Sequence, residues 1–278
     1  MRRQRLRWLL LLVPCVFVYH TTKTESHSLQ PLRAPEPMSN TYQYFTEIDV
    51  YSKSKLVGAI SHVDSRFGLR SEPLGVNDLQ STLVALFKSY TKTMEDLGIE
   101  TWLAHGTLLG HHWGRKILPW DTDIDVQVSM TTLRYLATKY NGTQYQHKSS
   151  TYLLDINPHY SIVSTADVSN KIDARWIDMN CGKYIDITSV HQNESTPSLL
   201  FCKDHHQYTS DEIYPLQPSI FEGVKVNIPI QAEDILSKEY GQNALVKSSF
   251  HWYKWDSKSQ RWNPKVAWWT FIRTFIWD

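Results

Sequence analysis

The most constraining feature of this chain is a run of three aspartates at alternate positions, Asp121, Asp123 and Asp125. If residues 117–128 form a strand, its two-residue period places all three carboxylates on one face of a sheet. Carboxylates this close repel one another unless a cation lies among them or one of them is protonated. Oxygen ligands favour a hard ion such as Mg2+ or Mn2+. The pattern is typical of a metal-dependent phosphotransfer site.

The alternative is an acidic, solvated surface strand, because Asp is a poor strand former. Two features favour the metal site. Apolar residues alternate with the acids, and Gly106-Thr107 precedes them at the spacing that a strand, a tight turn, a short helix and a second strand require. We therefore expect a catalytic or metal-binding role for the aspartates.

The spacing of apolar residues predicts the elements around this segment. One helix begins at Asn77 or Asp78 and stops at Gly98. The other expected elements are a strand at 99–104, a turn at 106–107, a strand at 117–128, a helix at 131–140, and a hairpin of 171–178 and 183–190 around 180–182. The second arm of that hairpin delivers Asp186 into the sheet.

Five ordered blocks between about residues 95 and 245 carry a family resemblance. They are Leu103–Gly110, Ile117–Asp125, Arg175–Asp178 with Gly182–Ile187, Asp211–Leu216, and Phe221–Gly223 through Tyr240-Gly241. The chain resembles the LicD and fukutin-related family, in a fungal or other eukaryotic Golgi form. The resemblance implies an α+β, polymerase-beta-type nucleotidyltransferase fold, with a mixed sheet and flanking helices.

The acids then receive distinct expected roles. Asp123 and Asp125 would hold both metal ions. The resemblance implies that Asp186 completes the trio, either as a metal ligand or as the group that takes the acceptor proton; a solvated Asp is the alternative. Asp121 is expected in the second shell or as an additional ligand, and His105 in the second shell, as a packing or hydrogen-bonding histidine.

Donor phosphates would lie against the small-residue segment. Gly106 allows close approach of the backbone, and Thr107 with neighbouring N–H groups at a helix start can bind phosphate oxygens. Arg115 and Arg175 could offset the phosphate charge, with a surface salt bridge as the alternative for each.

The resemblance implies transfer of a phosphorylated alcohol or sugar from a nucleotide-diphosphate donor, CDP- or GDP-linked, to a glycan acceptor. Nothing in the sequence separates the two nucleotides. Two other classes remain open: a non-catalytic regulator or partner of a mannosylphosphate transferase, and an aromatic glycan-binding module.

Composition narrows the substrates. The 278 residues contain 41% hydrophobic residues, which suits one catalytic unit with short extensions. Lys and Arg number 29 against 28 Asp and Glu, a formal charge of +1, so no basic field is available to hold a nucleic-acid backbone.

The N-terminus has the layout of a targeting segment, with basic residues 1–7 before an apolar run at 8–19. We expect an uncleaved signal anchor over 1–22, with the catalytic domain in the lumen of the Golgi or ER; a cleaved signal peptide is the alternative. Residues 23–70 are expected to be a stem. Sequons at Asn141 and Asn193 agree with this orientation.

The catalytic domain is expected over 71–250, followed by an aromatic extension, 251–278, packed on it. Its tryptophans could instead stack on sugar rings or rest at a membrane interface. Cys181 and Cys202 are expected to form a disulfide, with two free buried thiols as the alternative. A zinc site at Cys202, His205 and His206 is less expected, because adjacent histidines rarely aim at one ion and no fourth ligand is evident.

Overall fold

The computed structural model describes residues 42–50, 60–68, 76–164 and 167–265, all within one compact unit. The expected anchor at 1–22 and the tryptophans Trp268, Trp269 and Trp277 lie outside these residues. In the part that is described, no helix has the length and apolar character that crossing a bilayer requires.

The first helix, α1 (Val76–Asp96), confirms the helix expected from the apolar spacing. Its apolar face is almost fully buried and consists of Leu79, Leu83, Leu86, Phe87, Tyr90 and Met94. Gly98 follows with a φ of 65°, a left-handed conformation that glycine adopts without a steric cost.

A mixed sheet forms the centre of the unit. Strands β5 (Thr143–His147), β6 (Ser150–Ile156), β7 (Ala174–Asp178) and β8 (Tyr184–Gln192) pair antiparallel in that order. β8 also pairs in parallel with β4 (Asp125–Ser129), which pairs with β3 (Trp102–Leu103). The C-terminal end of β8 pairs antiparallel with β9 (Leu199–Phe201), and β9 pairs antiparallel with β10 (Gln207–Thr209). The expected mixed sheet and the 171–190 hairpin are confirmed.

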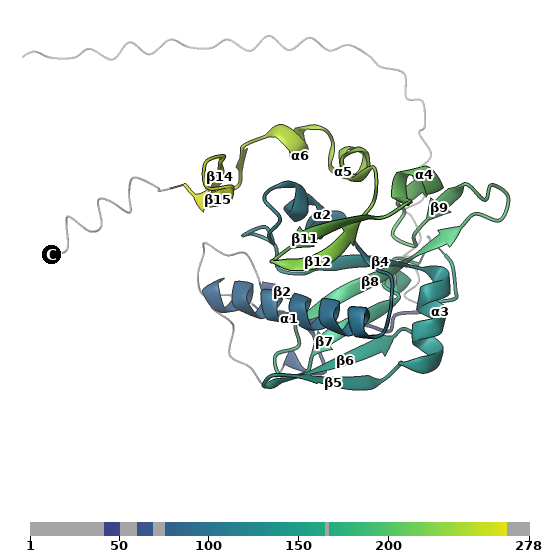
Figure 1. The fold of residues 1–278 in the computed structure, drawn as a ribbon. Coiled ribbons are helices and arrows are strands. Elements are labelled where there is room, and N and C mark those ends of the chain that lie inside the picture. The colour runs from purple at the N-terminus through teal and green to yellow at the C-terminus, as the bar shows by residue number, and fades with distance from the viewer. Residues whose placement is uncertain (1–41, 51–59, 69–75, 165–166, 266–278) are drawn as a thin grey trace, which may run out of the picture. The chain divides into compact units, whose positions relative to one another are not determined.

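The two faces of this sheet differ in chemistry. α1 and α3 (Met130–Lys139) pack on one face, as Figure 1 shows, over a core that includes Val126, Trp176 and Ile187. Because side chains alternate along a strand, the neighbouring residues on β4, β7 and β8 point to the opposite face. Those neighbours are Asp125, Arg175 and Asp186.

The expected strand at 117–128 is wrong over most of its length. Residues 117–124 form turns and loop, and the strand begins only at Asp125. Pro119 has no N–H to give to a ladder, and aspartate disfavours extended pairing. The expected strand at 99–104 shrinks to two residues, and Gly106 and Thr107 belong to the first turn of helix α2 (His105–His112) rather than to a separate turn.

The expected stem at 23–70 also needs correction. Within it, β1 (Glu47–Val50) and β2 (Ile60–Asp64) form an antiparallel hairpin of the compact unit. The Asp64 N–H donates to the Gly182 carbonyl at 2.8 Å, and Val63 bridges Lys183. The hairpin therefore attaches to the turn between β7 and β8.

The remaining elements follow β10. They are α4 (Ser210–Ile213), the hairpin of β11 (Gln217–Phe221) and β12 (Val224–Ile228), α5 (Ala232–Tyr240), α6 (Asn243–Val246), β13 (Ser249–Phe250), β14 (Tyr253–Asp256) and β15 (Arg261–Pro264); a short 3-10 turn, η2 (Val168–Asn170), precedes β7. The boundary expected at residue 250 falls inside the β13–β15 sheet.

Three of the C-terminal tryptophans are described. Trp255 and Trp262 pack against Trp113 at ring-centroid distances of 5.1 and 4.9 Å, and Trp262 also contacts Trp120 at 5.0 Å. Trp252 is 59% exposed. Part of the aromatic segment thus closes over the loop that leads to the aspartates, and part of it faces solvent.

The expected disulfide is absent, because Cys181 and Cys202 are both free thiols. Cys181 lies before β8 begins, whereas Cys202 follows Phe201, which pairs with His191 near the end of β8. At about 3.3 Å per residue, the strand separates them by roughly 20 Å, far beyond the Cα separation that a disulfide spans. Burial raises the pKa of each thiol to about 11.

Candidate active site

The site is built on the parallel pairing of β4 and β8. Asp125 stands directly opposite Asp186 in the register, and the Asp186 N–H donates to the Ile124 carbonyl at 2.9 Å. Residues paired in this way project from the same face of a sheet. The two carboxylates therefore meet on the polar face, away from α1 and α3.

Asp121 and Asp123 join them from the preceding loop. Burial raises the pKa of Asp121 and of Asp125 well above the ordinary value, and the charge of Asp123 adds to the effect in both. Burial also raises the pKa of Asp186 to about 6, against the lowering effect of Arg175 and with the help of Asp123. The structure thus brings the expected acids together, although a loop, not strand alternation, places two of them.

This donor set fits a hard divalent cation. The buried carboxylates repel one another, and a cation among them would remove that repulsion while accepting oxygen ligands only. A Cβ atom built on Gly106 would lie 3.2 Å from Oδ2 of Asp121, so the glycine leaves room beside the acids. The residues present therefore suit Mg2+ or Mn2+.

Helix α2 begins against the same cluster. Its N-cap, Ala104, provides no side-chain cap, and the Thr107 hydroxyl accepts the Asp125 N–H at 2.8 Å. Thr107 thereby fixes the start of β4 to the first turn of α2. Gly106 and Thr107 lie where the sequence placed them, beside the acids, and their phosphate-binding role stays a prediction.

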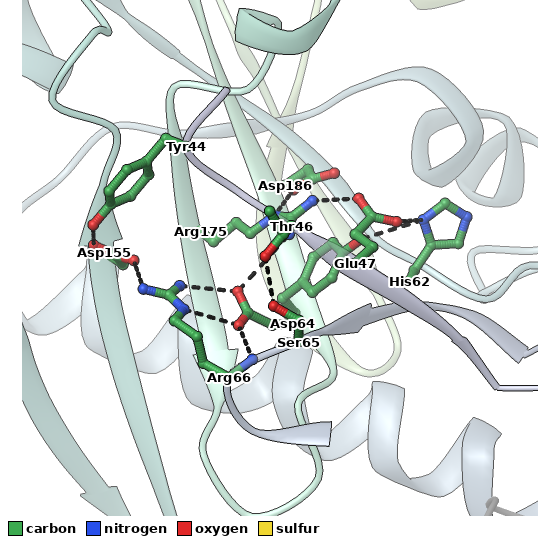
Figure 2. A network of polar contacts seen from close by, with 11 residues as sticks. Tyr44, Thr46, Glu47, His62, Asp64, Ser65, Arg66, Asp155, Arg175 and Asp186 are labelled. Carbon is green, nitrogen blue, oxygen red and sulfur yellow. Dashed lines mark hydrogen bonds and ion pairs between the residues drawn. The ribbon is translucent and has the colours of Figure 1, made fainter. Parts of the chain in front are cut away.

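Arg175 has a different position from the one expected for a phosphate ligand. Its Nε donates to Asp186 Oδ1 at 2.8 Å and its Nη2 to Glu47 Oε1 at 2.6 Å, as Figure 2 shows. The guanidinium lies 3.6 Å from the Tyr184 ring centroid, and the side chain is 1% exposed. Arg175 supports the acids from within the protein, so the donor-phosphate expectation is contradicted.

Arg115 is not part of the cluster either. It is exposed on the turn after α2, with a φ of 60°, and its carbonyl accepts from the Glu222 N–H. Its charge acts on His111, where it adds to burial in lowering the pKa to about 4. The expected contact between Arg115 and donor phosphate finds no support in this placement.

The β1–β2 hairpin contributes residues that sequence reasoning missed. His62 Nδ1 lies 3.6 Å from Glu47 Oε2 and 3.7 Å from Asp123 Oδ2. Lys183, on the attached turn, donates to the Thr122 carbonyl at 3.0 Å, and burial lowers its pKa to about 8 despite the charge of Asp123. No motif or local spacing signals the contacts of His62 with Asp123 and of Lys183 with Thr122, because each joins residues 61 positions apart in the chain.

A second arginine fastens the hairpin to the sheet. Arg66 contacts both carboxylate oxygens of Asp64 at 2.9 Å and Oδ2 of Asp155 at 2.7 Å, and Tyr44 donates to Asp155 at 3.0 Å (Figure 2). Asp155 belongs to β6, so these bonds hold β2 over the polar face. The position of Glu47 beside Arg175 follows from this attachment.

His105 lies at the other edge of the acids. Burial lowers its pKa, but the hydrogen bond and charge of Glu239, with a contribution from Asp125, outweigh burial and raise the pKa to about 9. This agrees with the expected hydrogen-bonding role. Its main partner, Glu239 on α5, is another residue that the sequence did not single out.

The two sequon asparagines lie at or near the surface. Asn141 is exposed, and its Oδ1 accepts from the Ile156 N–H at 2.9 Å. Asn193 is half-buried in the turn between β8 and β9. Their glycosylation stays a prediction.

Comparison with known proteins finds a family that is similar to the segment holding this site. Residues 98–231 match the family described as LicD/FKTN/FKRP, nucleotidyltransferase domain. Mannosyltransferase regulator 14 of Saccharomyces cerevisiae is 26% identical over 240 residues, 81% of this chain and 24% of that protein. Mannosyltransferase regulator 4 of the same yeast is 31% identical over 163 residues, 56% of this chain and 13% of that protein. The chain thus spans about a quarter or less of the length of these relatives.

Among solved structures, the lincosamide antibiotic adenylyltransferase LnuA with lincomycin bound is 12% identical, with 58% of this chain and 94% of that chain covered and a TM-score of 0.29. This structural similarity is too weak to support a conclusion about fold or function. The family match rests instead on the segment that contains Asp121, Asp123, Asp125 and Asp186. Residues 98–231 of this chain are thus similar to the nucleotidyltransferase domain of the LicD/FKTN/FKRP family.

Proposed function

We propose that this chain transfers a phosphorylated alcohol or sugar from a CDP- or GDP-linked donor to a glycan, with Mg2+ or Mn2+ held by Asp123, Asp125 and Asp186. The observation that carries the proposal is the parallel register of Asp125 with Asp186 beside a loop that adds Asp121 and Asp123. A bound divalent cation would supply charge neutralisation at the phosphoryl group and polarisation of the attacking oxygen.

Arg175 defines what Asp186 can do. It occupies Oδ1 of Asp186 at 2.8 Å, which leaves Oδ2 to bind a cation or to accept the proton of an acceptor hydroxyl. The pKa of Asp186 of about 6 suits proton acceptance near neutral pH. Gly106 and the first-turn N–H groups of α2 would receive the donor phosphates, since this uncapped helix start adjoins the acids.

The setting of the reaction is part of the proposal. The yeast relatives are named as mannosyltransferase regulators, which supports a mannose-containing glycan as the acceptor. The balanced charge of +1 supports no role on nucleic acids. The N-terminal segment and the sequons support a membrane-anchored protein with a luminal catalytic domain in the Golgi or ER.

The test is nucleotide release by the full chain. We expect CMP or GMP to appear from a CDP- or GDP-linked donor when a mannan oligosaccharide and Mn2+ are present, and to be lost on chelation. Asp123→Asn should abolish release, whereas Asp78→Asn, an exposed acid on α1, should not. Equal release by the wild type and Asp123→Asn would exclude this enzyme function.

The names of the yeast relatives favour one second candidate, a regulator of a mannosylphosphate transferase. A regulator would stimulate a partner transferase equally well with Asp123 or Asn at this position, and would release no nucleotide alone. Exposed Trp252 supports a glycan-binding module only if glycan binding persists after chelation and after Asp125→Asn.

A further inference from the structure

A second group of metal-ligand side chains lies beside the acid site. His105 begins α2, His206 lies in the turn between β9 and β10, and Glu239 is on α5. His105 Nδ1 is 3.2 Å from Glu239 Oε2, and His206 Nδ1 is 3.6 Å from Glu239 Oε1. One ligand atom from each residue lies within 4.8 Å of the other two. Three distant segments of the chain thus converge on one point.

The carboxylate of this group is deeply placed. The Glu239 side chain is 4% exposed and that of His105 is 11% exposed. A buried carboxylate requires a compensating charge. Among the described residues, the ion-pair partners of Glu239 are the two histidines, and neighbouring Lys238 pairs with Glu212 instead. A cation bound between these three side chains would take the place of the proton with which His105 otherwise balances this carboxylate.

The spacing suits a tetrahedral transition-metal ion. Metal–ligand bonds of about 2.0–2.1 Å place tetrahedral ligands about 3.3 Å apart. His105 Nδ1 lies 3.2 Å from Oε2 of Glu239, close to that value, and His206 Nδ1 lies 3.6 Å from the other oxygen, Oε1, so the carboxylate faces both imidazoles. Two imidazoles and one carboxylate favour zinc-class ions over Mg2+. This donor set therefore differs in metal preference from the oxygen-only acid site.

The fourth position has room. A cavity of about 170 Å3 adjoins the group and is lined by His206, Glu239 and five neighbouring residues, among them the exposed His205. One water requires only about 10–15 Å3 in the same measure, so a water and a small substrate group both fit. Three protein ligands with one open position is the make-up of zinc sites that bind an exchangeable ligand.

A chain of hydrogen bonds holds Glu239 in place. Tyr208 donates to Glu239 Oε1 at 3.2 Å, Gln127 donates to the Tyr208 oxygen at 3.3 Å, and Trp102 donates to Gln127 at 3.1 Å. Such outer contacts orient metal ligands. Gln127 lies on β4 two residues after Asp125, so both sites are supported by the same strand.

We propose that His105, His206 and Glu239 bind a Zn2+-class ion at a site separate from the Mg2+ or Mn2+ site of the aspartates, with water or a substrate oxygen in the fourth position. His206 takes part in this site, whereas Cys202 and its neighbour His205 are not in the group. The proposal does not depend on phosphotransfer activity.

The test uses Co2+ as a spectroscopic probe on the full chain. Co2+ in a four-coordinate nitrogen–oxygen site absorbs strongly in the visible range, whereas Co2+ among oxygen ligands in six-coordination absorbs weakly. We expect an intense band that His206→Ala and Glu239→Gln abolish. His205→Ala, on the adjacent exposed histidine, should retain it, as should Asp123→Asn. A wild-type protein without the band, or a band that persists in His206→Ala, overturns the proposal.

A second measurement, the shift of the unfolding temperature caused by Zn2+, tests the site in a variant that keeps its fold. Zn2+ should raise the unfolding temperature of the wild type, and His206→Gln, which keeps a polar side chain at a half-buried position, should remove this shift while unfolding cooperatively. An equal Zn2+ shift in the wild type and His206→Gln also overturns the site. Nucleotide release with Mn2+ is measured separately, so a failure here leaves the proposed transferase function intact.

Discussion

Replacing Arg175 with Met tests the central electrostatic feature of the candidate site. The substitution keeps most of the apolar stem and removes a guanidinium that is 1% exposed and contacts Asp186 and Glu47 at 2.8 and 2.6 Å. Of these partners, Asp186 is buried and Glu47 is 38% exposed, so the loss falls mainly on Asp186. The remaining carboxylate would lie unpaired beside three further acids.

The expected cost follows from this burial. Removing one partner of a buried pair costs about 3–5 kcal/mol, because an uncompensated charge stays in the interior. Loss of the stacking on Tyr184, at 3.6 Å from the ring centroid, acts in the same direction. For a domain of this size, each kcal/mol corresponds to about 2–4 °C, so the unfolding temperature should fall by roughly 6–20 °C.

Urea unfolding in the presence of a chelator, followed by tryptophan fluorescence, measures the change in the free energy of unfolding. Lys92→Met is the matched control, since Lys92 and its partner Asp96 are 57% and 55% exposed, and such a surface pair contributes little to the free energy of unfolding. Asp186→Asn added to Arg175→Met should recover part of the loss, because the unpaired charge disappears. A loss no larger than that of Lys92→Met, or strictly additive effects in the double variant, would refute the assigned role.

Three further predictions concern the acids. Burial raises the pKa of Asp125, so its charged form is unfavourable in the metal-free fold, and Asp125→Asn should leave the metal-free unfolding temperature unchanged or raise it. Mn2+-dependent nucleotide release should fall by more than about 100-fold. An unfolding temperature lowered by more than about 5 °C would contradict this. Gly106→Val should weaken Mn2+ binding in calorimetry by about tenfold, since its Cβ would lie 3.2 Å from Asp121 Oδ2. Unchanged binding would show that the metal site does not need the space that Gly106 leaves beside the acids. Because the folded pKa of Asp186, about 6, exceeds its ordinary value of 3.8, the metal-free fold binds more protons than the unfolded chain, and its stability should fall as pH rises from 4 to 7. Asp186 should contribute on the order of 2–3 kcal/mol to this loss, and Asp186→Asn should reduce the loss by that amount, while the raised pKa values of Asp121 and Asp125 maintain the remainder. A flat wild-type profile, or an unchanged profile in Asp186→Asn, would contradict it.

The sequence correctly predicted those elements whose patterns lie in neighbouring residues. The α1 leucines, the α3 helix and the β7–β8 hairpin followed from spacing, because helix and strand periods are written in neighbouring residues. The same reasoning failed at 117–124, where alternating acids imitated a strand period. There, Pro119 and the mutual repulsion of the carboxylates favoured a loop.

The acids of the site, the small residues beside them and the family resemblance could be identified from neighbouring residues of the chain. The folded structure was needed to find that Arg175 pairs with Asp186 and Glu47, that Glu239 contacts His105, and that both cysteines are free thiols. Arg175 and Asp186 are only 11 residues apart but meet through the register of the β7–β8 hairpin, whereas the contacts of Glu47 and Glu239 join residues more than 100 positions apart. The energies of these contacts depend on burial and on register. Neither quantity leaves a pattern among neighbouring residues.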